Sequence, residues 1–74
     1  MKKSFRQGEA IVFEPQWALD KMVDERHPLR YGEIVYFLTD IPNVGGHCIV
    51  AKYDGKVVPM VHPGDFRVAT EDEL

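Results

Sequence analysis

Short apolar runs separated by turn-forming residues make up most of this chain. Glycine, proline or aspartate lies at the ends of these runs, a pattern typical of short β-strands. The pattern predicts strands at 10–13, 34–39, 47–53, 56–61 and 66–69. We therefore expect a mainly β protein with short connections.

The sharpest turn signal is Asp54-Gly55, between the third and fourth predicted strands. Both residue types tolerate positive φ, so they predict a tight hairpin between antiparallel strands. Pro59 lies in the second arm and has no N–H to donate, which predicts an edge strand or a bulge. Residues 40–46 predict a connecting loop, and residues 62–65 predict a tight turn of 3₁₀ type.

Residues 15–30 interrupt the strand pattern with a long loop. Apolar residues recur within 16–24 at helical spacings behind Pro15, a residue favoured in a first helical turn, and predict one or two turns of helix. His27-Pro28 ends any helix, because the residue before proline is driven from the α region. Five strands with this short helical insertion predict a small antiparallel barrel, whose closure removes exposed edges.

Length and composition limit the function classes. With 74 residues, 45% of them hydrophobic, and a net charge of -3, the chain has room for one modest core and is not a multidomain enzyme. We expect a single domain over 1–74, with a basic N-terminal arm at 1–7 and an acidic C-terminal tail at 70–74.

No apolar run approaches the roughly 18 residues that a bilayer span requires. The chain has one cysteine and therefore no internal disulfide, which favours a reducing compartment. These features predict a cytoplasmic protein with no membrane contact.

Several segments resemble known β-barrel families. The segments are FRQGEAI at 5–11, YGEIV at 31–35, IPN at 41–43, GHCIV at 46–50, DGKV at 54–57 and HPGDFR at 62–67. The first two are similar to the strand openings of SH3-like barrels of the KOW and Tudor kind. The other four resemble short uncharacterised proteins encoded by bacteriophages and prophages. The resemblance implies an SH3-like barrel and, by analogy with barrels that dock on RNA polymerase, a phage-encoded regulator that binds a host machine.

The possible metal ligands are His27, His47, Cys48 and His62, and their spacing does not predict a zinc site. Structural zinc sites usually combine two close pairs of ligands. Here the only close pair is adjacent, and neighbours on a strand point to opposite faces. Cys48 lies in an apolar run, which favours a core position over a catalytic thiol. We expect no enzyme activity, no metal and no cofactor.

The loop at 15–30 predicts a partner-binding surface. Trp, Tyr and Arg dominate interface hot spots in proteins. The candidate partner-binding residues are Trp17, Arg26, His27, Arg30 and Tyr31. Trp17 either staples the loop to the barrel or anchors the interface, and the small size of the core favours the staple.

Two alternatives to a protein-interaction module stay open. The first is a nucleic-acid-binding barrel with Tyr31 as a stacking platform, although six basic against nine acidic residues over 7–70 give it little support. The basic residues of that alternative are Lys2, Lys3, Arg6, Arg26 and Arg30. The second is a structural component of a larger assembly, as a monomer or as a weak homodimer paired through the edge at Pro59.

Overall fold

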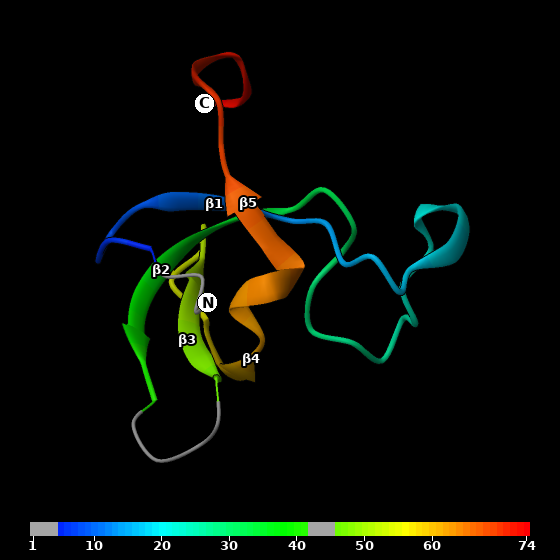
Figure 1. Cartoon of the computed structure of the whole chain (residues 1–74), viewed down its shortest axis with the longest axis horizontal. Coiled ribbons are helices and arrows are strands. Elements are labelled where there is room, and N and C mark those ends of the chain that lie inside the picture. Colours follow the sequence, from blue (N-terminus) through cyan, green and yellow to red (C-terminus); the bar gives the residue numbers. More distant parts are fainter. Residues whose placement is uncertain (1–4, 42–45) are drawn as a thin grey trace.

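A computed structural model describes residues 5–41 and 46–74, which contain five antiparallel strands in one sheet. The strands are β1 (Ala10–Phe13), β2 (Ile34–Asp40), β3 (Cys48–Lys52), β4 (Val57–Val61) and β5 (Phe66–Val68). Their order across the sheet is β4-β3-β2-β1-β5, so a meander from β1 to β4 is followed by a return of β5 to the free side of β1 (Figure 1). The predicted strands are confirmed, each to within one residue at either end.

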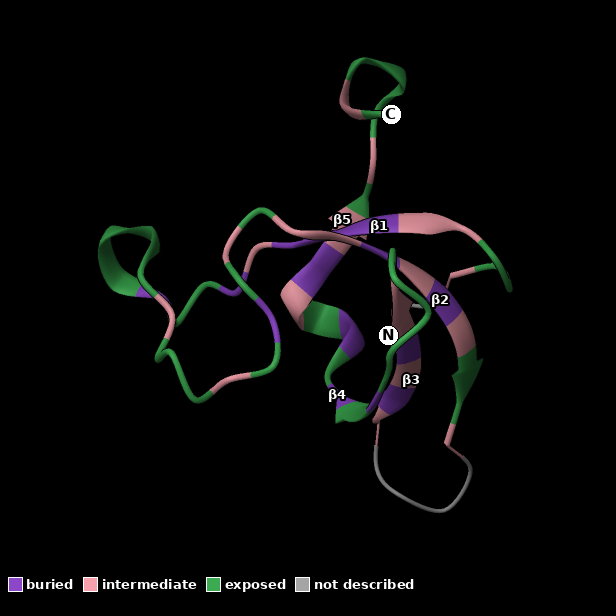
Figure 2. Ribbon diagram, turned by 180° about the vertical axis from the view of Figure 1, so that it is seen from behind, coloured by how far each residue is buried: buried purple, intermediate pink, exposed green. Residues whose placement is uncertain are grey.

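The core lies inside the curl of this sheet (Figure 2). Val35 and Phe37 of β2 are buried, as are Cys48 and Val50 of β3, because side chains on one face recur with a period of two. The full core cluster is Ile11, Phe13, Leu29, Val35, Phe37, Cys48, Val50, Val58, Val61 and Phe66. Leu29 is the member that comes from outside the strands and brings the long loop into the core.

The turns around β4 follow the sequence predictions. Gly55 has φ of 90° in the hairpin between β3 and β4, and the hairpin is closed by a hydrogen bond from the Lys52 N–H to the Lys56 carbonyl at 2.7 Å. β4 ends the strand order, and its register with β3 shifts beside Pro59, so the predicted edge strand and bulge are both present. The 3₁₀ turn η2 (Pro63–Asp65) then leads into β5.

The predicted helical insertion within 16–24 is present only as the single 3₁₀ turn η1 (Leu19–Lys21). Asp20 and Lys21 have positive φ of 56° and 60°, which interrupts a right-handed helix. Leu19 and Met22 belong to the apolar residues with helical spacing, and both are exposed. A short helix depends on burying an apolar face, and without that burial it is not stable.

The C-terminal tail extends beyond the sheet (Figure 1). Residues 71–73 of the acidic tail form a third 3₁₀ turn, η3 (Glu71–Glu73), which is closed by a capping box at Thr70. The predicted basic arm at 1–7 and loop at 40–46 fall partly outside the described residues. Within the described part, no helix has the length and apolar character to cross a membrane.

Candidate functional site

The segment between β1 and β2, residues 14–33, projects from the sheet (Figure 1), and its returning half is attached to the core. Leu29 is fully buried. His27 stacks on Phe13 with ring centroids 5.1 Å apart, and its Nδ1 accepts a hydrogen bond from the Leu29 N–H at 3.1 Å. The returning half of the segment therefore has a fixed position against β1.

Arg30 braces the same segment from within. Its guanidinium donates hydrogen bonds to the carbonyls of Val23 at 3.2 Å, Asp24 at 2.6 Å and His27 at 2.6 Å. Arginine offers five N–H donors in a rigid fork, which suits it to collecting several carbonyls. This predicted partner-binding residue thus holds the backbone of the loop, with its charge directed at three carbonyl oxygens.

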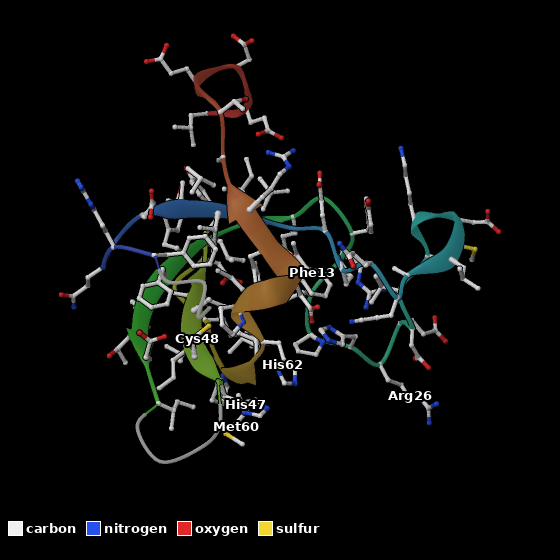
Figure 3. The ribbon with its side chains drawn as sticks, in the orientation of Figure 1. Phe13, Arg26, His47, Cys48, Met60 and His62 are labelled. Atoms are coloured by element: carbon white, nitrogen blue, oxygen red, sulfur yellow. The ribbon has the colours of Figure 1, made fainter. Side chains whose placement is uncertain are left out.

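Arg26 lies on the outside of the loop (Figure 3). Its guanidinium forms an exposed ion pair with Asp24 at 3.2 Å. Hydrogen bonds from the Arg26 side chain and backbone hold the pKa of Asp24 below its ordinary value. An exposed pair of this kind adds little stability, so Arg26 can reorient toward a partner at low cost.

Trp17 staples the loop to the rest of the fold and keeps a large exposed face. Its ring packs edge-on against Phe13 at a centroid distance of 6.2 Å and lies 6.0 Å from the ring of His27. Its Nε1 donates to Asp65 Oδ2 at 3.3 Å, which ties the loop to η2. Nevertheless 54% of Trp17 is exposed, so the side chain staples the loop and also presents apolar surface.

Two further apolar side chains project close to Trp17 in the sequence. Leu19 is 81% exposed and Met22 is 74% exposed. We call Trp17, Leu19 and Met22 the η1 surface. Leu19 and Met22 are absent from the predicted partner-binding residues, which were selected as the Trp, Tyr, Arg and His side chains of the loop.

A hollow of about 380 Å³ lies where the base of the loop meets η2 and β5. Its walls are formed by Glu14, Pro15, Gln16, Ala18, Tyr31, Gly64, Phe66 and Arg67. Tyr31 is half-buried in this wall, whereas Trp17, Arg26, His27 and Arg30 are absent from it. The structure therefore brings Trp17, His27 and Arg30 together in the loop and places Tyr31 at the hollow.

Arg67 forms a charged cluster at the edge of this hollow. Its Nε and Nη2 each donate a hydrogen bond to a carboxylate oxygen of Glu14 at 2.9 Å. Its Nη1 and Nη2 donate to the carboxylate of Glu73 at 2.7 and 2.6 Å. These hydrogen bonds lower the pKa of Glu73 to about 2 and also lower that of Glu14, while the two carboxylates raise the pKa of Arg67. The cluster holds the acidic tail against β1 and β5.

His47 and His62 meet at the opposite end of the sheet, beside Cys48 (Figure 3). Their ring centroids are 4.2 Å apart and their planes are tilted by 42°. Cys48 is fully buried, and burial raises the pKa of its thiol to about 11, so it stays protonated. Over residues 5–41 and 46–74, no three His, Cys, Asp or Glu side chains gather into a metal-binding cluster.

Comparisons with protein-family models, curated proteins and solved structures found no match for this chain. The resemblance to SH3-like barrels and to small phage proteins therefore stays a prediction. Function has to be inferred from the contacts, exposure and charge of the described residues.

Proposed function

We propose that the protein is a non-catalytic interaction module that binds a protein partner through the η1 surface. The observation that carries this proposal is the exposure of three large apolar side chains, Trp17, Leu19 and Met22, within six residues of one projecting loop. Single exposed apolar residues are normal on protein surfaces, but a group of them marks an interaction site. Trp17 is the residue type most suited to anchor such an interface.

The bracing of the loop supports this role. Arg30 fixes the loop backbone, Leu29 is inserted in the core, and Trp17 is hydrogen-bonded to Asp65. A surface that is already ordered before binding loses less conformational entropy when a partner docks. The loop therefore combines exposed apolar groups with a preorganised backbone, as a docking site requires.

We further propose that the sheet is an SH3-like barrel. The return of β5 beside β1, the long β1–β2 connection, the tight β3–β4 hairpin and the 3₁₀ turn before β5 support it. The sequence resemblance suggests a large bacterial enzyme complex such as RNA polymerase as the partner. On this proposal the protein is a phage-encoded regulator that acts in the cytoplasm of the host.

Ion pairs that engage three of the described basic residues favour a protein partner over nucleic acid. Arg67 is held by two carboxylates, Arg26 pairs with Asp24, and Lys52 pairs with Glu33 at 3.5 Å. Phosphate backbones are gripped by clusters of lysine and arginine whose charge is available. The charges of Arg67 and Lys52 are largely taken up by these carboxylates, which leaves less positive charge for a phosphate backbone.

A pull-down from bacterial lysate tests the proposal. Wild-type protein should retain a specific partner, and Leu19→Ser combined with Met22→Ser should lose it while remaining folded, because both side chains are exposed. The matched control is Tyr53→Ser, since Tyr53 is 89% exposed on the β3–β4 hairpin and lies outside the η1 surface. Retention of the partner by the double variant, or a salt-sensitive shift of single-stranded DNA or RNA without any protein partner, would contradict it.

A further inference from the structure

His47 and His62 are placed opposite one another by the end of the β3–β4 ladder. Cys48 and Val61 are register partners, and both side chains belong to the core cluster. His47 precedes Cys48 and His62 follows Val61, so the two histidines form the next cross-strand pair outward. Because strand neighbours point to opposite faces, this pair lies on the side away from the core.

The bulge in β4 creates this pairing. Val50 pairs with Val58 and Cys48 pairs with Val61, so one residue of β3 faces two residues of β4, Pro59 and Met60. Met60 has a positive φ of 63°, as a bulge residue often does. Without the extra residue, the register would place a different side chain opposite His47.

One ring nitrogen of this histidine pair lacks a hydrogen-bond partner among the described residues. His47 Nδ1 is buried and has no hydrogen-bond partner among the described residues. Buried side-chain nitrogens are nearly always hydrogen-bonded, and an exception calls for a missing ion, water or functional role. The neighbouring His62 is exposed, so an ion can reach the pair from solvent.

We propose that His47 and His62 together bind one divalent first-row transition-metal ion of the imidazole-preferring group, which includes Zn²⁺, Ni²⁺ and Cu²⁺. Neutral imidazole is the most common protein ligand for these ions. The ring centroids are 4.2 Å apart, and His62 is exposed, so its ring can turn to bring one nitrogen close to the unpartnered Nδ1 of His47. Water completes the coordination, because the described residues add no third His, Cys, Asp or Glu ligand.

The other candidate ligands do not belong to this site. His27 packs on Phe13 and its Nδ1 is used by the Leu29 N–H. The thiol of Cys48 is buried among core residues on the opposite face of β3. The proposed site is therefore specific to two of the three histidines in the chain.

Imidazole NMR signals followed during a Zn²⁺ titration of the full chain test this inference. The signals of His47 and His62 should shift together and saturate at one equivalent, while the His27 signal stays in place. His62→Gln should lower the affinity for Zn²⁺ roughly tenfold or more, as loss of a metal-site residue does. His62 is exposed, so this variant should fold; Cys48→Ala is the control that should still bind.

Four results would overturn the proposal. They are no response of His47 and His62 up to millimolar Zn²⁺, an equal response of His27, an unchanged affinity in His62→Gln, and a loss of binding in Cys48→Ala with retained fold. The last of these would assign the metal to the thiol. None of these outcomes depends on the proposed docking role of the η1 surface, so the two proposals can fail separately.

Discussion

Leu29 attaches the projecting loop to the core by burying its side chain there, and Leu29→Ala tests that attachment. The side chain is 0% exposed and belongs to the core cluster. Replacement by alanine removes buried apolar atoms and leaves a cavity, which costs about 2–5 kcal/mol. A domain of this size has a total unfolding free energy of about 4–11 kcal/mol, at roughly 0.05–0.15 kcal/mol per residue. Leu29→Ala should therefore remove a large share of the stability and lower Tm by about 10 °C or more.

Urea unfolding provides the assay, with two signals that report on different parts of the molecule. Fluorescence of Trp17, the single tryptophan, reports on the loop, and circular dichroism reports on the sheet. The matched control is Leu19→Ala, since Leu19 lies on the same loop and is 81% exposed. That control should change the unfolding free energy by less than about 0.5 kcal/mol. The attachment would be refuted if Leu29→Ala cost less than about 1 kcal/mol, or if both substitutions cost the same.

Three further predictions concern the tail, the thiol and the backbone. The pKa of Glu73 is lowered from 4.5 to about 2, so its ion pair with Arg67 stabilises the fold above pH 4.5 and this stabilisation disappears as the pH falls toward 2. Glu73→Gln should lower the urea midpoint at pH 7, and its midpoint should converge with that of wild type at low pH; parallel curves would contradict the pairing. Cys48 should react with a disulfide reagent at pH 8 only after unfolding, because it is buried and its pKa is raised to about 11; rapid reaction of the native protein would contradict this. Met60→Gly should raise the unfolding free energy by about 0.5–1 kcal/mol, because φ is positive at Met60 and glycine adopts positive φ without strain. Gly55→Ala should lower the unfolding free energy by about 1 kcal/mol or more, for the same reason in reverse. Urea unfolding measures both changes, and the opposite signs would contradict the two backbone conformations.

The strand pattern could be predicted from sequence because each strand is bounded by its own local signal. Asp54-Gly55 specifies a hairpin, Pro59 specifies an edge with a bulge, and Pro63-Gly64 specifies a tight turn. The helical prediction is met only by the 3₁₀ turn η1, because apolar spacing does not say whether a face is buried. Leu19 and Met22 have helical spacing, but both are exposed.

The candidate site was predictable only in part, since several of its contacts depend on tertiary register. Trp17 and His27 could be selected by residue type, and both contact Phe13. Arg67 reaches Glu14 across 53 positions of sequence, because β5 returns beside β1. The Thr70-x-x-Glu73 capping box was readable in the sequence, but the contact of its glutamate with Arg67 was not.

The central claim is that the η1 surface touches a protein partner. Its most direct test is photo-crosslinking in bacterial cells, with a benzophenone amino acid placed at Leu19 in one variant and at Tyr53 in another. Both positions are exposed, so both variants should fold and both probes are accessible. We predict a discrete crosslinked protein from position 19 and none from position 53. A crosslink from position 53 alone, or the same products from both positions, would contradict the claim.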